Sequence, residues 1–327
     1  MKYVYYWIVA TALLTIPSEA FSQSRREQVR AHVDSVLTER YYKTPYDTNY
    51  VVRPEGRLTL KVRLNQSGDD FHVRGDKDGI NNKADLSTTH KTSLSIGGSY
   101  RGISASLAVN PDKMKGAYKD YEFNLAYYSS RLSLDASYHR STTLSGDIER
   151  GDYSGHLEKE GVKLKMANLA AYYVFNHRRF SYPAAFSHSY IQRRSAGSFL
   201  LAASGQGQHG EVDRDTPIRF KMTNIGIGAG YGYNFVPARG WLLHLSALPT
   251  FIVYTNTSLT MGGTEVPLHY HFPEVIITGR GAIVKQIGRS MFAGFSMVYY
   301  FTNIGDKEDL SVYHQKWLSR LYFGFRL

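Results

Sequence analysis

From residue 57 onward, the sequence consists of long segments in which apolar and polar residues alternate with a period of two. In 57–66, for example, leucine and valine alternate with polar residues, and 131–140 repeats the pattern. This period gives a β-strand one apolar and one polar face. We predict twelve strands, at 57–66, 88–98, 101–109, 120–129, 131–140, 162–175, 191–204, 218–235, 239–254, 274–286, 289–302 and 315–327. Most have the roughly 9–11 residues that a membrane-crossing strand needs, whereas strands of soluble domains average about five or six.

The connections between these segments alternate in length along the chain. The short or compact ones are 99–100, 130, 176–190, 236–238 and 287–288, although 176–190 is too long for a tight turn. The longer, polar ones are 67–87, 110–119, 141–161, 205–217, 255–273 and 303–314. We therefore predict an all-β fold, an antiparallel up-and-down transmembrane β-barrel of about twelve strands. Its short turns and both termini would face the periplasm, and loops such as 67–87, 141–161 and 255–273 the cell exterior.

Before the barrel, the chain has two further regions. Residues 1–22 have a positive residue, an apolar stretch ending at Pro17 and a small-residue cleavage site, as a signal peptide does; a retained anchor is the alternative. Residues 23–56 contain a helical pattern over 24–43, followed by a break at Pro45. The predicted organisation is thus a signal peptide (1–22), a periplasmic helix with an extended segment (23–56) and the barrel (57–327).

Composition permits this class of membrane protein and excludes the helical one. After residue 22, no stretch approaches the roughly 20 apolar residues of a transmembrane helix. A barrel wall exposes only every second side chain to lipid, so the mean hydropathy of −0.34 is compatible with it. The alternative fold is a soluble exported β-sandwich, which the long strands and their interfacial aromatic residues disfavour. A closing strand that carries Phe323 and Phe325 is typical of outer-membrane barrels.

Two predicted strands change the side on which their apolar residues lie. In 162–175 the apolar set moves from even to odd positions after Met166, and in 218–235 it does so after Met222. A shift by one residue predicts a β-bulge in each strand. The second shift leaves glycine at each inward position from Gly226 to Gly232. Such a file of glycines predicts a bend, or the close approach of an in-folded loop.

Charge is divided unequally between the predicted strands and loops. The six long loops hold 18 acidic and 10 basic residues, whereas the strands and short turns hold 22 basic and only four acidic ones. Because Arg or Lys costs about 2–4 kcal/mol against lipid at the membrane midplane, bases on the polar face should point into the lumen. The predicted lumen-lining bases are Lys61, Arg63, Arg131, Lys163, Lys165, Arg219, Lys221, Arg280, Lys316 and Arg320.

A basic lumen is compatible with three functions. In the first, the bases pair with carboxylates and in-folded loops, so that the barrel is structural or binding and its lumen largely filled. In the second, they line a narrow pore that prefers small anionic solutes. In the third, the protein is a lipid-modifying enzyme of the outer membrane, for which His139, Ser141 and Asp135 are the only hint. We expect no enzyme, no catalytic or cofactor-binding residues, no cofactor and no metal site.

A second group of bases is predicted at the periplasmic rim. It comprises Arg101, Arg178, Arg179, Arg193 and Arg194. Anionic headgroups of the inner leaflet explain such a cluster, so outer-membrane lipids are an expected partner. The aromatic closing strand makes the barrel-insertion machinery a second expected partner. Small anionic solutes are the third expected partner. Nucleic acid is not expected, because the chain is exported and its bases are spread around a wall.

Several short stretches resemble a known family. They are Tyr46 to Val51, Lys91 to Gly102, Asn110-Pro111 and Arg194 to Ser198. They are similar to landmarks of an uncharacterised outer-membrane β-barrel family of Bacteroidota-type bacteria that is catalogued as a domain of unknown function. The resemblance covers most of the chain after the signal peptide. It implies a barrel in the outer membrane and assigns no activity and no functional residues.

Overall fold

The computed structural model divides the chain into two units, Met1–Pro45 and Tyr46–Leu327. The structure describes residues 27–28, 31–32, 34–36, 38–39 and 43 of the first unit, and 46–56, 58–77, 80–100, 103–109, 121–212, 218–261, 263–266, 274–306 and 310–327 of the second. The predicted signal peptide lies outside these residues. In the first unit the described residues between 27 and 39 are helical, within the predicted helix 24–43. None of the helices in the described part of the chain has the length and apolarity that crossing a membrane requires.

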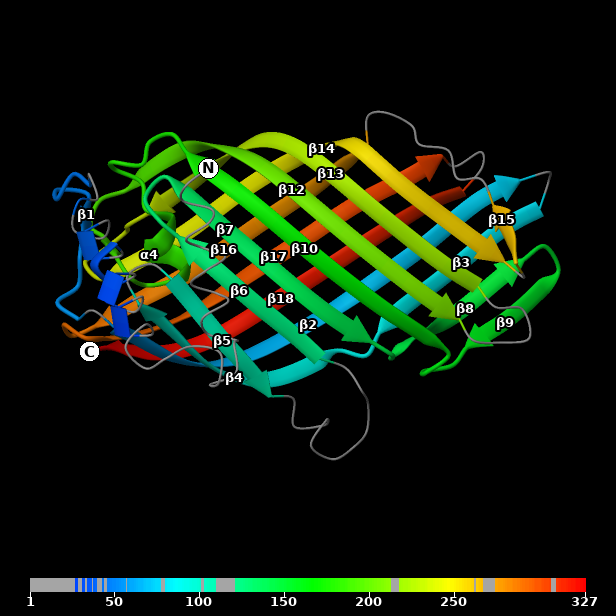
Figure 1. Ribbon diagram of the computed structural model, residues 1–327, viewed down its shortest axis with the longest axis horizontal. Helices are drawn as coiled ribbons and strands as arrows, with labels where there is room; N and C mark the ends of the chain where they lie inside the picture. Colours follow the sequence, from blue (N-terminus) through cyan, green and yellow to red (C-terminus); the bar gives the residue numbers. More distant parts are fainter. Residues whose placement is uncertain are drawn as a thin grey trace. The chain divides into compact units, whose positions relative to one another are not determined.

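The second unit is a closed, antiparallel β-barrel (Figure 1). Each strand pairs with the next, and the last, β18, pairs with the first, β2, from Thr59 to Arg74. The ring contains the twelve strands that the alternation predicts. They are β2 (Leu58–Lys77), β4 (Lys91–Tyr100), β5 (Ile103–Val109), β6 (Tyr121–Tyr128), β7 (Leu132–Ser141), β10 (Val162–Val174), β12 (Ala196–Val212), β13 (Ile218–Phe235), β14 (Trp241–Met261), β16 (Val275–Ile287), β17 (Met291–Asp306) and β18 (Leu310–Arg326).

Several strands extend far beyond their predicted ends, at the end of the barrel where we expected long loops. The predicted loop 205–217 is strand as far as Val212, and most of 303–314 belongs to β17 and β18. The extended parts of β12 and β17 pair with β13 and β18 in the same register as the rest of these strands. The alternation fails as a signal in this region because both faces of these extensions carry polar residues, so a polar strand resembles a loop in sequence.

Strand β10 contains no bulge, contrary to the prediction. Its register with both neighbours is unbroken from Leu164 to Tyr173, and its even-numbered residues face inward throughout. The apolar residues change sides because the apolar surroundings lie inside the barrel at one end of the strand and outside it at the other. Val162 packs inside the barrel against Leu144 and Leu157, whereas Leu169 and the odd positions after it lie on the outer surface.

The second predicted bulge exists, but in the neighbouring strand. Pairing of β13 with β14 shifts by one residue between Ile225 and Gly226, and the extra residue is Val253 of β14. The register of β13 with β12 is continuous along its whole length. The apolar residues of β13 therefore move from even to odd positions for the same reason as those of β10, and not because β13 contains a bulge.

A three-stranded extension leaves the barrel at the outer part of β2. β3 (Ile80–Thr88) pairs with β2, β8 (Leu144–Arg150) with β3, and β9 (Tyr153–Leu157) with β8. β15 (Thr264–Val266) pairs with β14 at the same end. Leu86 and Ile148 pack with Phe71 around the apolar cluster that contains Leu144, Leu157 and Val162. The extension thus covers this end of the barrel with a small core of its own.

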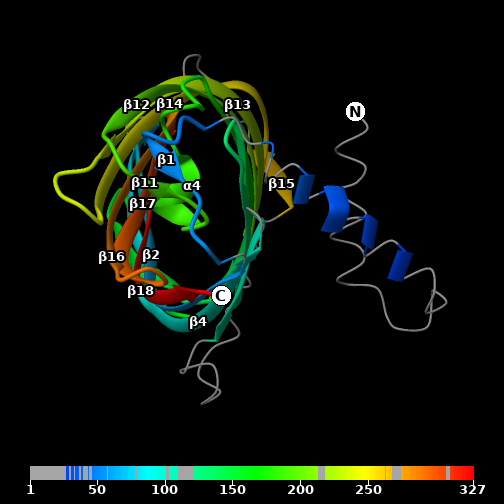
Figure 2. The same ribbon diagram turned by 90° about the vertical axis from the view of Figure 1, so that its left-hand side faces the viewer.

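The connection between β10 and β12 folds into the barrel. Figure 2 shows α4 (Tyr182–Phe186) within the ring of strands. The Ser181 hydroxyl caps the helix by accepting from the Ala184 N–H, and Pro183 lies in its first turn. The next residues, β11 (Ile191–Gln192), pair with β1 (Val51–Val52) of the segment that precedes the barrel. We call residues 176–190 the plug.

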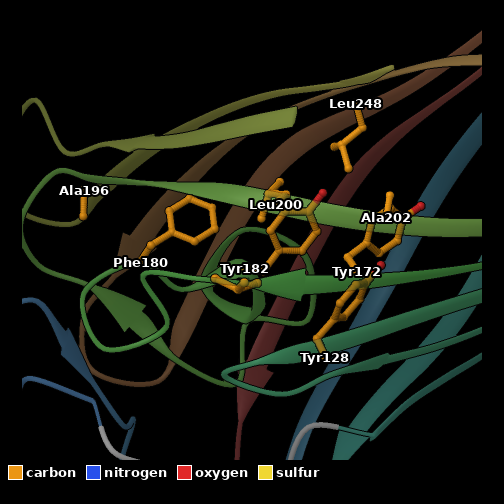
Figure 3. Close-up of a cluster of buried hydrophobic side chains, with 9 residues drawn as sticks. Tyr128, Tyr172, Phe180, Tyr182, Ala196, Leu200, Ala202 and Leu248 are labelled. Atoms are coloured by element: carbon orange, nitrogen blue, oxygen red, sulfur yellow. The ribbon is translucent and has the colours of Figure 1, made fainter. Parts of the chain in front are cut away.

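The plug is held by a core of aromatic and aliphatic side chains (Figure 3). Phe180 and Tyr182 are fully buried, and they pack against Leu200 and Leu248 of the wall and against Tyr172. At Gly232, a Cβ atom would lie 3.1 Å from the ring of Phe180. Gly232 therefore admits the plug. At Gly228 and Gly230, a Cβ atom would instead lie 2.1 Å from a main-chain oxygen of β14, so these two glycines allow the neighbouring strand to approach closely.

Candidate functional site

A cavity lies in the lumen of the described barrel, beside the plug. Its volume is ≈ 120 Å³, and Phe186 and His188 of the plug form part of its surface. The walls come from β2, β7, β10, β12, β16 and β18, among other strands. Five of the ten predicted lumen-lining bases reach it: Lys61, Arg63, Arg280, Lys316 and Arg320.

Lys61 joins the wall to the plug. Its ammonium group donates to the carbonyls of Phe186 and Ser187, at 3.1 and 3.2 Å, and lies 3.2 Å from Nδ1 of His188. Burial, together with the positive charges of Lys61 and Arg326, lowers the pKa of His188 well below its usual value. In the tautomer whose Nδ1 carries no proton, His188 can accept the third hydrogen of Lys61. All three donors of this lysine are thus engaged by the plug.

Arg280 is neutralised by the opposite wall. Its guanidinium lies 2.8 Å from the Asp135 carboxylate and donates to the Tyr172 hydroxyl at 2.6 Å. The same group lies 4.8 Å from the centre of the Tyr172 ring. Asp135 accepts a further hydrogen bond from the Tyr128 hydroxyl. This base therefore contributes no net charge to the cavity.

Lys316 belongs to a polar cluster farther along the lumen. Its ammonium group lies 3.0 Å from Nδ1 of His139 and 3.6 Å from the Asp69 carboxylate, which also faces His314 at 3.1 Å. Asp69 and His139 are both buried. The neighbouring pocket, lined by Met166, Gln208, Lys316 and others, has a volume of only ≈ 20 Å³. The lumen thus narrows beyond the cavity to about the space of one water molecule.

Arg63 and Arg320 differ from the other three bases. Neither forms an ion pair or a side-chain hydrogen bond with any residue that the structure describes. In the pairing of β2 with β18, Arg320 lies opposite Asn65, two positions from Arg63, so the two arginines are diagonal neighbours on the inner face. Lys61 lies two positions farther along β2. One side of the cavity is therefore positively charged, without a carboxylate from the described chain.

The other five predicted bases lie outside the lumen. Lys163, Lys165, Arg219 and Lys221 occupy the odd-numbered, outward positions of β10 and β13, which corrects our assignment. They lie near the ends of β10 and β13 that are opposite the short turns, where the outer face bears charge and the inner face apolar residues such as Met166 and Met222. Arg131 lies in the turn before β7, where its Nε donates to His177 at 3.1 Å.

Four of the predicted rim arginines surround the base of the plug. Arg178, Arg179, Arg193 and Arg194 are exposed. Arg179 lies 3.8 Å from the Asp47 carboxylate and 5.0 Å from the Tyr50 ring centre. Arg101 lies outside the described residues. These bases lie at the end of the barrel with the short turns, and two of the contacts join the segment before the barrel to the plug.

The alternation of the last strand predicts that Arg326 points inward, although we did not count it among the lumen-lining bases. It is buried and donates to the carbonyl of His188 and to the Gln286 side chain, at 3.0 and 2.7 Å. Sequence reasoning missed Asp69 and His188, because each lies in a segment that we predicted to be a connection.

The structure gives contacts for each of the three residues that hint at an enzyme. Asp135 pairs with Arg280, whereas His139 faces Asp69 and Lys316. The Ser141 hydroxyl lies 3.2 Å from that of Thr143. Among the described residues, no group of three or more His, Cys, Asp or Glu side chains is arranged to hold a metal ion.

The chain belongs to a protein family, since the model for a domain of unknown function (DUF4421) matches residues 45–327. No curated protein matches the chain. Among solved structures, it is similar to the translocator domain of the autotransporter NalP from Neisseria meningitidis, with 12% identity, 92% of this chain and 98% of that chain covered, and a TM-score of 0.38. The outer membrane protein OprG from Pseudomonas aeruginosa matches with 9% identity, 84% and 97% coverage, and a TM-score of 0.30. The P. putida toluene transporter TodX matches with 9% identity, 84% and 91% coverage, and a TM-score of 0.28.

Proposed function

We propose that this protein is an integral outer-membrane barrel that binds a small anion in its lumen. The membrane placement is supported by the outer surface, where large apolar side chains are exposed on strands all around the ring. They include Val62, Leu64, Leu94, Ile96, Phe123, Leu132, Leu169, Phe199, Leu201, Ile225, Ile227, Leu245, Phe251, Ile277, Ile283, Phe295, Met297, Leu321 and Phe323. A soluble monomer rarely exposes an apolar surface of this extent, whereas lipid covers it.

The unpaired arginines carry the anion proposal. Both side chains are half-buried in the lumen, and a partly desolvated charge without a partner is unfavourable, so proteins commonly pair such groups or bind a counter-ion. Lys61, Arg280 and Lys316 have partners within the protein, and Arg63 and Arg320 have none among the described residues. An anion between the two guanidinium groups would supply the missing charge. Planar guanidinium groups suit carboxylate, sulfate and phosphate, because each offers two parallel donors.

The size of the cavity limits the ligand. A cavity of about 150 Å³ in another protein holds one benzene molecule, and the volume here is ≈ 120 Å³. The ligand is therefore a single small anion or the charged end of a larger molecule. Inorganic sulfate and phosphate fit this limit.

Binding is favoured over conduction because the described lumen is obstructed on both sides of the cavity. The plug lies against it on one side, fixed by Lys61 and Arg326. On the other side is the pocket of ≈ 20 Å³ beside Lys316. A narrow anion-preferring pore remains the alternative, and it requires the plug to move.

The proposal is tested by titrating the purified barrel in detergent with sulfate and phosphate, using calorimetry at constant ionic strength. We expect binding that R63Q/R320Q abolishes. The matched control, R219Q/K221Q, removes two bases from the outer face and should leave binding unchanged. Equal binding by the wild type and R63Q/R320Q would refute the lumenal site. A steady anion-selective current in planar bilayers would favour the pore instead.

A further inference from the structure

The outer surface of the wall has a basic patch, at the end of the barrel opposite the short turns, that the lumenal site does not use. It consists of Arg140, Lys163, Lys165, Arg219 and Lys221, together with His209. These residues come from four adjacent strands, β7, β10, β12 and β13. Directly paired residues in an antiparallel sheet point to the same side. Lys165 pairs with Arg140 and with His209, and His209 pairs with Lys221, so the side chains form one continuous surface.

The patch has a surplus of positive charge. Its one described carboxylate is Glu211, which lies opposite Lys163 and Arg219 in the pairing and 2.9 Å from Nε2 of His209. The nearby positive groups lower the pKa of Glu211, the hydrogen bond from His209 being the largest cause. Among the described residues of these four strands, five lysine and arginine side chains therefore lie on one surface with a single carboxylate.

The patch lies directly beyond the apolar belt. Along β10, the outward residues from Leu169 to Phe175 are mostly apolar, and Lys165 is the next charged position. Ten residues separate Lys165 from Phe175, or roughly 33 Å of strand. At the tilt typical of membrane barrels, this corresponds to roughly 25 Å along the membrane normal, the height of the lipid-facing band. The bases therefore lie at the headgroup level of one leaflet.

A surplus of positive charge marks this sector of the wall, whereas on β2 and β3 the bases Arg74 and Lys83 are paired with Asp85 and Glu149. On β18, the outward residues at the corresponding end are Gln315, Trp317 and Ser319. On β14, next to the patch, Ser258 and Thr260 lie opposite Lys221 and Arg219. Attraction to an anionic membrane in general would not require such a cluster, whereas a ligand with several negative charges at one place would.

We propose that this patch binds the phosphate groups of a phosphorylated glycolipid in the outer leaflet. The leaflet follows from the end of the barrel: the patch lies opposite the short turns, at the end that faces the exterior in the proposed orientation. The acyl chains of such a lipid would lie on Leu169, Leu201 and Ile225, while its phosphates meet the bases above them. The inference rests on the proposed membrane placement and is independent of anion binding in the lumen.

The test measures binding of purified bisphosphorylated lipid A to the full-length barrel in detergent, by native mass spectrometry. We expect K165Q/R219Q/K221Q to weaken binding about tenfold, since each exposed charge contact contributes little and is partly screened by salt. The control, R178Q/R193Q/R194Q, removes three exposed arginines at the other end and should change binding little. All variants are first checked for heat-modifiable migration, which reports the folded barrel.

Two further arms make the outcome decisive. R63Q/R320Q should retain lipid A binding even where sulfate binding is lost, so failure of the lumenal proposal is distinguishable from failure of this one. Phosphatidylglycerol, with one phosphate, should bind more weakly than lipid A. Equal losses in the two triple variants, or a phosphatidylglycerol affinity equal to that for lipid A, would overturn the proposal.

Discussion

The ammonium group of Lys61 in β2 donates a 3.1 Å hydrogen bond to the main-chain carbonyl of Phe186, 125 positions later in the chain. This carbonyl belongs to the last residue of α4, and the helix C-terminus carries a partial negative charge. Both ends of the interaction are removed from bulk water. A single wall residue thus holds the plug against the inner face of the barrel.

Replacing Lys61 with methionine should loosen the plug. The substitution keeps the volume but leaves the carbonyls of Phe186 and Ser187 without this donor, at a cost of about 2 kcal/mol in the free energy of unfolding. Hydrogen–deuterium exchange over 182–190 should accelerate. K163M, on the exposed outer face, should leave exchange there unchanged, and an equally protected plug in K61M would contradict the proposed role.

Replacing Asp135 with asparagine should have opposite effects on stability and on anion affinity. It leaves Arg280 without its carboxylate partner 2.8 Å away, which costs about 3 kcal/mol. It also adds one positive charge to the cavity, so sulfate should bind several-fold more tightly. D47N breaks the more exposed contact with Arg179 and should cost less than about 1 kcal/mol. Weaker sulfate binding by D135N would argue against a charge-driven site.

Replacing Gly232 with valine should disturb the packing of the plug. The new Cβ would lie 3.1 Å from Phe180 and 3.3 Å from Leu200, so overpacking should cost about 1–3 kcal/mol. G207V is the control, because a Cβ at Gly207 meets nothing within 4 Å. In a double-mutant cycle, F180A should relieve part of the cost of G232V. Additive effects would mean that the two residues are not coupled.

The β2–β3 extension should lose stability in acid. Hydrogen bonds from His72 and then Arg74, each 2.6 Å from the Asp85 carboxylate, lower the pKa of Asp85 below its ordinary value of 3.8. A depressed carboxyl pKa contributes stability that is fully present above the ordinary value and lost as the pH falls through the lower, folded value. Exchange of the β3 amides should therefore rise below about pH 4, and D85N should remove this dependence. An unchanged pH profile in D85N would assign the effect to another group.

The barrel itself was predictable from sequence because its outer belt is apolar, which requires a strict alternation along each strand. Arg63 and Arg320 directly precede the outward residues Leu64 and Leu321, so they point inward. Beyond the apolar belt the outer face is polar as well, so the same alternation placed Lys163 and Lys165 on the wrong side. Polarity identifies the inner face only where the outer face is apolar.

The plug illustrates a different limit. The length of 176–190 indicated that it is no tight turn, and the glycines of β13 indicated that another segment approaches them. Nothing in the alternation connects these two observations, because the contact between Phe180 and Gly232 depends on how the strands close into a ring. The same holds for Lys61, whose partners are main-chain carbonyls and leave no trace in the sequence.

Anomalous diffraction from crystals grown with selenate tests the central claim most directly, because it locates a sulfate-like anion without reference to activity. We predict a selenium peak in the cavity of ≈ 120 Å³, within hydrogen-bonding distance of both Arg63 and Arg320. The peak should disappear in R63Q/R320Q crystals and persist in R219Q/K221Q crystals. A wild-type cavity without a selenium peak, or with Arg63 and Arg320 paired to a carboxylate of the chain, would contradict the account.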